Sequence, residues 1–403
     1  MDESKIINVY SFLLNLKMKV LMFGWEFPPY SSGGLGTACY GLTKSLSKEN
    51  IEITFVLPYD SELQADFINL VSTNIKLRKI DSLLKPYISS SIYSSIKNKR
   101  YNPNMYGASL FEEVYRYSEA AKEIALIEDF NIIHCHDWMT FKAGINAKQI
   151  KNKPLVVHVH ATEFDRTGGH GVNEHVYSIE KEGMEKADAV IAVSNFTKNK
   201  IMQHYGVNPD KIYVVHNAVE PKDNVIFEIK KYNKIVLFLG RVTLQKGPDY
   251  FLYAAKKVLE YDPNIKFIVA GSGDMEPFII EKAAELGISK NVLFAGFLQG
   301  DDVNKAYAMA DLYVMPSVSE PFGITALEAI RNGTPVLISK QSGVSEVITH
   351  CLKADFWDID DIANKILSAL KYKALHQTLK EHGNLEIKKF NWDEPARKCI
   401  DIY

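Results

Sequence analysis

Residues 312–330, L-Y-V-M-P-S-V-S-E-P-F-G-I-T-A-L-E-A-I, decide the fold of this chain. An apolar, strand-like run ends at a Ser-Glu-Pro-Phe-Gly turn, and an apolar run with helical spacing follows at once. Open α/β sheets place their ligands at strand-to-helix turns of this kind. The free backbone N–H groups at the start of such a helix also favour an anion such as a phosphate.

The same pattern of strand-like and helical runs extends through the whole chain and predicts parallel α/β sheets. A polar stretch at 219–233 divides the runs into two series, so we expect two doubly wound, Rossmann-like domains. The predicted strands are 19–24, 53–58, 132–136, 155–160, 189–194 and 212–217, then 234–240, 266–271, 292–296, 312–317 and 335–339. The spacing within 60–110 indicates no particular element.

These series give the expected domain organisation. We predict an N-terminal extension at 1–17, a first domain at 18–218, a linker at 219–233, a second domain at 234–387 and a C-terminal helix at 388–403. Asp393 is a candidate cap for the terminal helix, and its apolar residues indicate that the helix is packed rather than free.

Composition excludes several classes of protein. The 403 residues suggest two cores, and a formal net charge of −2 argues against a general nucleic-acid-binding protein, which normally has a basic surface. Four scattered cysteines without a C-x-x-C pair indicate reduced thiols in a cytoplasmic protein.

The apolar run at 6–16 resembles the core of a signal peptide. Asp2 and Glu3 remove the basic leader of such a peptide, and the run is too short to span a bilayer. No other segment approaches transmembrane length, so we expect no transmembrane segment.

Two glutamates and a basic loop are the first candidate site. Glu320 precedes the predicted helix, and Glu328 lies about two turns into it, where a carboxylate can bind a ribose diol. A capping Glu320 and a solvated Glu328 are the alternative. The loop G-R-V-T-L-Q-K-G (240–247) brings Arg241 and Lys246 to the same edge of the sheet, where they suit a pyrophosphate. An exposed basic loop without a ligand is the alternative there.

With these residues, the chain resembles retaining nucleotide-sugar glycosyltransferases of the GT-B fold, namely family-4 glycosyltransferases and their glycogen-synthase relatives. The resemblance rests on the R-x4-K loop, on E-P-F-G-I-T-A-L-E with seven residues between its glutamates, and more weakly on G-S-G-D at 271–274. It covers nearly everything from Met18 onward. It implies an acceptor-side first domain, a second domain that binds the nucleotide sugar, and a terminal helix that packs back on the first domain.

The resemblance also implies roles for residues of the second domain. Glu320 would contact the donor sugar at the reacting centre, and Glu328 would bind the ribose. Arg241 and Lys246 would neutralise the leaving diphosphate. The distal phosphate would lie on the backbone amides of Phe322, Gly323, Ile324 and Thr325, and the nucleobase would lie near Phe297 and Leu298.

Three elements of the first domain match the family pattern. In S-S-G-G-L-G (31–36), Gly34 would let a phosphate or sugar approach the backbone; a tight turn is the alternative. In H-D-W (136–138), Asp137 would lie on the acceptor or sugar side. In H-V-H-A-T-E-F-D (158–165), His160 would contact the donor sugar, whereas a structural histidine is the alternative.

Two motifs also allow a metal interpretation. H-C-H (134–136) and H-V-H (158–160) place pairs of histidines on one face of a strand, and D-I-D-D (358–361) contains a D-x-D. We favour sugar contacts for the histidines and helix capping for the aspartates. We therefore expect no metal and no cofactor.

The expected reaction is transfer of a hexose from a nucleoside diphosphate sugar to a hydroxyl of a glycan, glucan or glycoconjugate, with retention. Glycogen synthases typically have Lys two residues before the Gly-Gly of the first loop, where this chain has Ser31. This departure argues against a glycogen synthase and favours the broader family-4 group, although a glycogen or starch synthase is kept as an alternative. A nucleotide-sugar 2-epimerase of the same fold and a non-catalytic carbohydrate-binding protein are two others.

Overall fold

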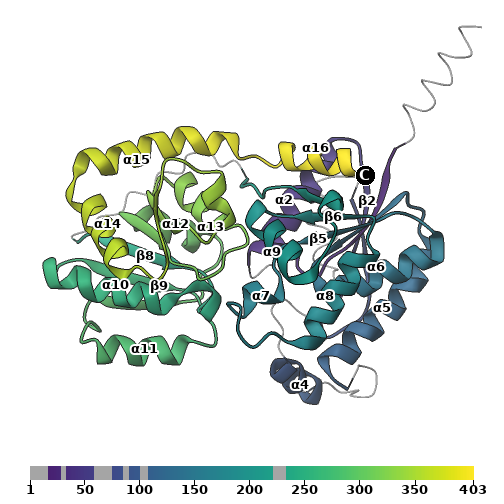
Figure 1. Ribbon diagram of the computed structural model, residues 1–403, viewed down its shortest axis with the longest axis horizontal. Coiled ribbons are helices and arrows are strands. Elements are labelled where there is room, and N and C mark those ends of the chain that lie inside the picture. Colours follow the sequence, from purple (N-terminus) through teal and green to yellow (C-terminus); the bar gives the residue numbers. More distant parts are fainter. Residues whose placement is uncertain (1–16, 29–32, 59–74, 85–89, 100–107, 221–232) are drawn as a thin grey trace, which may run out of the picture.

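The computed structural model describes residues 17–28, 33–58, 75–84, 90–99, 108–220 and 233–403. Within these residues it contains two parallel sheets in two lobes, with helices on their faces (Figure 1). The fold class expected from the sequence is thereby confirmed. The extension at 1–17, apart from Lys17, and most of the linker at 219–233 lie outside the described residues.

The first sheet has the strand order β3-β2-β1-β4-β5-β6-β7. Its strands are β1 (Lys19–Phe23), β2 (Glu52–Leu57), β3 (Ile75–Lys79), β4 (Ile132–His136), β5 (Leu155–Val159), β6 (Ala189–Ala192) and β7 (Ile212–Val214). Its helices are α2 (Gly34–Lys48), α4 (Ser90–Lys99), α5 (Leu110–Ile127), α6 (Trp138–Lys151), α7 (Glu163–Arg166), α8 (Glu174–Lys186) and α9 (Asn195–Tyr205). Every residue of β4 and β5 is buried, as expected for central strands covered on both faces.

The second sheet has the order β10-β9-β8-β11-β12-β13. Its strands are β8 (Ile235–Leu239), β9 (Lys266–Ala270), β10 (Val292–Gly296), β11 (Leu312–Met315), β12 (Val336–Ser339) and β13 (Leu352–Ala354). The helices and 3-10 turns of this lobe are η3 (Leu244–Lys246), α10 (Pro248–Tyr261), α11 (Glu276–Glu285), α12 (Asp301–Met309), α13 (Ile324–Arg331), η4 (Gly343–Glu346), α14 (Ile359–Lys371) and α15 (Lys373–Glu386).

Two edge strands, β3 and β13, were not predicted from the sequence. β3, I-K-L-R-K, carries three basic residues, and β13 has only three residues. Charged and very short strands are typical of sheet edges, where they block further pairing, and they lack the apolar run that identifies a buried strand. The helix α4 also lies in the 60–110 region for which we predicted no element.

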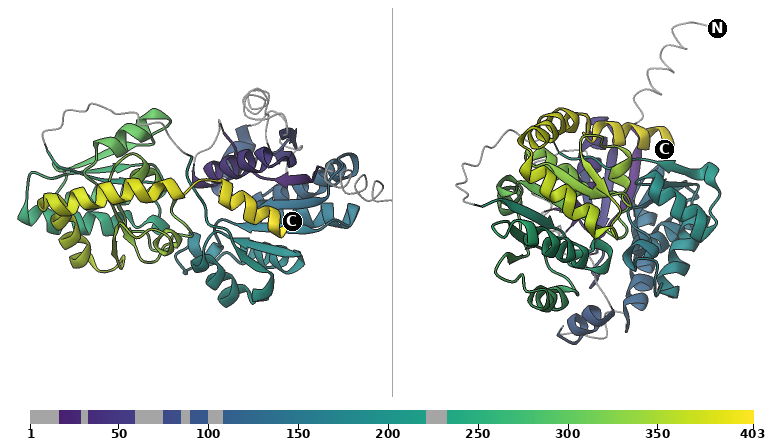
Figure 2. Two further views of the ribbon diagram at one scale, coloured as in Figure 1. Left: turned by 90° about the horizontal axis from the view of Figure 1, so that it is seen from above. Right: turned by 60° about the vertical axis from the view of Figure 1, so that its left-hand side comes forward.

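The chain returns to the first lobe at its C-terminus. From α15 it passes to α16 (Asp393–Ile402), which packs on α2 (Figures 1 and 2). A Cβ atom on Gly41 of α2 would lie 2.1 Å from Nε1 of the buried Trp392, so only glycine permits this contact. The prediction that Asp393 caps this helix is wrong: Trp392 occupies the cap, and Asp393 accepts a hydrogen bond of 3.2 Å from Ser45.

The D-x-D motif lies at a helix start, as predicted. The Asp358 side chain accepts a hydrogen bond of 2.9 Å from the backbone N–H of Asp361, in the first turn of α14. This geometry confirms helix capping for Asp358. Among the described residues, no helix has the length and apolar character that crossing a membrane requires.

Candidate active site

Glu320 lies in the turn between β11 and α13 and is almost fully buried, with 5% of its surface exposed. Its carboxylate pairs with Lys246, with Nζ and Oε2 2.5 Å apart, and accepts a hydrogen bond of 3.2 Å from Ser317. The backbone N–H of Glu320 donates to Gln341, and its C=O accepts from Gly343, both at 2.9 Å. The turn is thus fixed to the loop after β12, and the carboxylate has a defined position.

The basic loop after β8 reaches the same turn. Arg241 donates a hydrogen bond of 2.9 Å to Gln245, and Lys246 ends η3. Gly247 follows with φ of 63°, and a Cβ there would lie 2.3 Å from the carbonyl oxygen of Pro316 at the end of β11. Only glycine therefore allows the loop to lie this close to the Glu320 turn.

The start of α13 has no side-chain cap. Its cap residue, Gly323, has φ of 107° and no side chain to offer, so the first amides of the helix depend on other partners. Phe322 is buried beside it, and Thr325 accepts a hydrogen bond of 2.9 Å from Tyr313. This end of α13 carries the positive end of the helix dipole and suits an anionic group.

Glu328 lies within α13. The hydroxyl of Tyr307 donates a hydrogen bond of 3.2 Å to the Glu328 carboxylate. Desolvation raises the pKa of Glu328, and Arg331 opposes this shift. At the end of β10, Phe297 has 49% of its surface exposed, and Leu298 is half-buried. An exposed aromatic ring at a strand end offers a surface on which a base can stack.

Asp137 occupies a strained position at the end of β4. Its backbone has φ of 59° and ψ of 172°, a conformation that costs free energy for a residue other than glycine and is found mostly at functional sites. Its Oδ1 atom accepts hydrogen bonds from the backbone N–H groups of His160, at 2.7 Å, and Ala161, at 3.3 Å. Burial raises the pKa of Asp137 to about 7.

His160 follows β5 and is partly exposed. Its Nε2 lies 3.0 Å from Nδ1 of His136, and burial lowers the pKa of His160 well below its usual range. The ring is therefore neutral at pH 7. Asp137 and His160, chosen separately from the sequence, lie side by side and are joined through the backbone of the β5 loop.

Gly34 begins α2 and is exposed, and a Cβ placed on it would meet no atom of the described residues within 4 Å. The preceding Gly33 supplies no side-chain cap, and its N–H donates to the buried Glu26 at 2.7 Å. Among the described residues, none fills the space beside this helix start. Glu26 was not predicted as a site residue, although its place just after the first strand is a signal for one.

The two lobes meet on either side of Glu320. Ser319 donates a hydrogen bond of 2.6 Å to Asp165, and Lys200 lies 3.0 Å from the same carboxylate. On the other side, Ser194 donates to the carbonyl oxygen of Pro321 at 2.6 Å. These contacts hold the Glu320 turn against both the segment that follows His160 and the start of α9.

A further contact between the lobes caps α9. The Glu346 carboxylate accepts hydrogen bonds from the backbone N–H groups of Asn195, at 2.9 Å, and Phe196, at 2.6 Å. A carboxylate of the second lobe thus serves as the anion at a helix start of the first. None of the contacts between the lobes was predicted from the sequence, because the residues that meet there are more than 100 positions apart.

Comparisons with known proteins agree with this architecture. The family model described as Glycosyltransferase Family 4 matches residues 32–223, and that described as Glycosyl transferases group 1 matches residues 219–385. An uncharacterized glycosyltransferase of Methanocaldococcus jannaschii, MJ1607, is 30% identical over 96% of this chain and 98% of its own. A glycogen synthase of Mycobacterium tuberculosis is 23% identical over 96% of this chain and 94% of its own.

Solved structures show the same fold. A sucrose-phosphate synthase from Thermosynechococcus elongatus matches with a TM-score of 0.77 and 20% identity, over 96% of this chain and 98% of its own. Alr3699/HepE of Anabaena, in complex with UDP and glucose, matches with a TM-score of 0.70 and 17% identity, over 95% and 98%. The chain therefore belongs to the group 1 and family 4 glycosyltransferases and is a nucleotide-sugar-dependent glycosyltransferase of the GT-B fold.

Proposed function

We propose that this enzyme transfers a hexose from a nucleoside diphosphate sugar to a hydroxyl of a carbohydrate or glycoconjugate acceptor, with retention of the anomeric configuration. The observation that carries the proposal is the pair of Lys246 and Glu320, 2.5 Å apart beside the uncapped start of α13. This arrangement puts positive charge and free amides next to a fixed carboxylate. The positive charge and the amides would stabilise a diphosphate leaving group. The carboxylate would stabilise a sugar that gains positive charge.

The leaving group presents the main energetic difficulty. Negative charge develops on the diphosphate as the bond to the sugar breaks, and groups already oriented towards that charge lower the barrier most. Arg241, Lys246 and the backbone amides from Phe322 to Thr325, around the start of α13, would meet that charge. Glu328 would hold the ribose, and Phe297 and Leu298 would border the base.

The first lobe would hold the sugar and the acceptor. His160 is neutral and partly exposed, so its ring can exchange hydrogen bonds with a sugar hydroxyl without bringing a charge. Asp137 fixes the backbone of His160, and Gly34 leaves space at the start of α2. The acceptor hydroxyl would pass its proton to the departing phosphate, which requires no separate base and favours retention. We propose that the step needs no metal and takes place in the cytoplasm.

A thermal-shift screen identifies the donor. ADP-, UDP- and GDP-sugars are compared, because a ligand that binds the folded state raises the melting temperature by mass action. UDP-glucose is the first to test, since the Anabaena structure with a TM-score of 0.69 is a complex with it. No shift with any sugar nucleotide would contradict the proposal.

The product then decides the reaction. The active donor is incubated with candidate acceptors, and NMR of the new glycosidic bond should show the donor configuration; inversion would contradict retention. Activity should survive EDTA, and loss on chelation restored by one divalent ion would contradict metal-independent transfer. Extension of a glucan primer would favour the glycogen-synthase alternative suggested by the M. tuberculosis relative, and an isomerised donor without acceptor would indicate a 2-epimerase.

A further inference from the structure

Four histidines form a stack between β4 and β5, beside the proposed active site. His134 and His136 have ring centroids 4.5 Å apart, and those of His158 and His160 are 4.2 Å apart. Two hydrogen-bond-length contacts join the pairs: His134 to His158 at 3.2 Å, and His136 to His160 at 3.0 Å. Sugar binding alone does not account for four imidazoles, because only His160 is partly exposed.

Three ring nitrogens of the stack lack a hydrogen-bond partner among the described residues. They are Nε2 of His136, Nε2 of His158 and Nδ1 of His160, and all three are shielded from solvent. Buried polar atoms are almost always paired, so these three nitrogens call for a further partner such as a water or an ion. A neutral imidazole can bind a cation through the lone pair of such a nitrogen.

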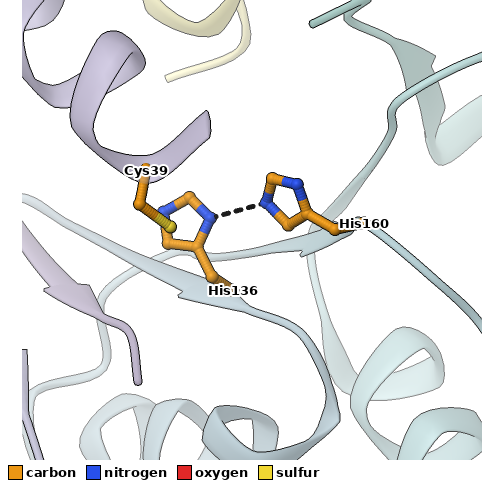
Figure 3. Close-up of side chains that lie close together, drawn as sticks. All are labelled: Cys39, His136 and His160. Atoms are coloured by element: carbon orange, nitrogen blue, oxygen red, sulfur yellow. Dashed lines mark hydrogen bonds between the residues drawn. The ribbon is translucent and has the colours of Figure 1, made fainter. Parts of the chain in front are cut away.

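Cys39 completes the cluster from the opposite side. It comes from α2, and its sulfur lies beside the ring of His136, while His160 faces that ring from the end of β5 (Figure 3). One ligand atom from each of these three residues lies within 4.8 Å of the other two. Tetrahedral zinc has bonds of about 2.0–2.3 Å, which place its ligand atoms roughly 3.3–3.6 Å apart. The sulfur would therefore move inward, and the two imidazole nitrogens, now 3.0 Å apart, would exchange their mutual contact for the metal and separate slightly.

The chemistry of the set favours a borderline-soft metal. One thiolate and two neutral imidazoles are typical zinc ligands, and a set of three leaves the fourth position open. A thiol that coordinates such a cation gives up its proton and binds as the thiolate. The carboxylates of Glu26 and Asp137 act electrostatically on the same thiol and would attract a cation. His160 is partly exposed and gives the site a way in from the surface.

We propose that Cys39, His136 and His160 form a binding site for a divalent transition metal of the zinc type, and that its occupation inhibits the enzyme. Binding would hold the His160 ring and withdraw it from the donor sugar. The inhibition rests on the proposed function, because it assumes that His160 contacts the donor. The metal site itself does not rest on that function.

Cobalt is the probe for the site. The reduced full-length protein is titrated with Co²⁺ alone, and one equivalent should bind with a thiolate-to-cobalt charge-transfer band. The band should disappear in Cys39→Ser, and Co²⁺ binding should weaken by more than about tenfold, since even changes outside the ligand shell cost about 10–100-fold in metal affinity. The half-buried Cys351 lies elsewhere, so Cys351→Ser should keep the band.

Two histidine variants distinguish this site from a neighbouring set of three histidines. His134, His136 and His158 also bring ligand atoms within 4.8 Å of one another. His158→Gln should keep the thiolate band, and His160→Gln should lose it even if Cys39→Ser folds poorly. Absence of Co²⁺ binding, a band that survives Cys39→Ser, or binding that depends on His158 without a thiolate band would overturn the site.

Inhibition has its own test. Zn²⁺ should inhibit transfer by the wild type, EDTA should restore it, and Cys39→Ser should be active and at least tenfold less sensitive, on the same reasoning as for cobalt. An active wild type that binds one Co²⁺ and is insensitive to Zn²⁺ would refute the inhibition. Failure of every donor to react would count against the proposed function alone, because the cobalt spectrum does not depend on turnover.

Discussion

Lys246 and Glu320 are 74 residues apart in sequence, yet Nζ of the lysine lies 2.5 Å from Oε2 of the glutamate. The contact joins the loop after β8 to the turn after β11, two neighbouring strands of the second sheet. It explains why a basic loop and an acidic turn occur together in this chain. The carboxylate is almost fully buried and keeps its charge partner at hydrogen-bonding distance.

Replacement of Lys246 by alanine should weaken binding of the nucleoside diphosphate. A charge-assisted hydrogen bond of this kind contributes about 1.5–3 kcal/mol, which corresponds to roughly a 10–150-fold higher Kd. Calorimetric titration with the diphosphate measures the change. Lys305→Ala is the control, since Lys305 pairs with Asp302 on an exposed helix and should bind normally. Unchanged affinity in Lys246→Ala would show that the loop does not contact the diphosphate.

The buried carboxyl of Asp137 should make stability depend on pH. Its pKa is raised from 3.8 to about 7 in the folded state. Between these values the folded protein holds a proton that the unfolded chain has lost, so stability falls as pH rises, by at most about 1.4 kcal/mol per unit. Asp137→Asn removes this titration.

The measurement is the free energy of unfolding of both proteins between about pH 4 and 7. The asparagine variant should gain stability relative to the wild type as pH rises, and the difference should level off above about pH 7. Asparagine also tolerates positive φ and keeps an oxygen for the N–H of His160. A difference that does not vary with pH would contradict the raised pKa.

The terminal helix should stabilise the first lobe. Trp392 is buried against α2, and truncation of a buried tryptophan to alanine costs about 3–5 kcal/mol. Arg397 is exposed on the same helix, so Arg397→Ala should change the stability by less than about 0.5 kcal/mol. Chemical denaturation compares the two variants. Equal stabilities would refute the packing role, as would full activity and a normal melting temperature after deletion of 388–403.

The sequence predicted the parts of this structure that repeat a local pattern. Buried parallel strands such as β4 and β5 are continuous apolar runs, so they were located within one or two residues. Motif spacing also placed Lys246 and Glu320 in one site. Contacts set by packing between distant elements left no such signal: Asp165 with Ser319, and Cys39 with His136, depend on how lobes and layers meet.

Substitution of Glu320 by glutamine tests the central claim most directly. Glutamine keeps the shape of the side chain and removes its charge, so folding and donor binding should persist while turnover falls at least about 100-fold, the scale of losing one charge-stabilising group at a reacting centre. Glu285→Gln on the exposed end of α11 is the matched control. Turnover of Glu320→Gln with the donor from the thermal-shift screen is measured beside donor affinity. Loss of turnover at normal affinity is the result that we predict, and wild-type turnover would contradict the role of Glu320 at the reacting sugar.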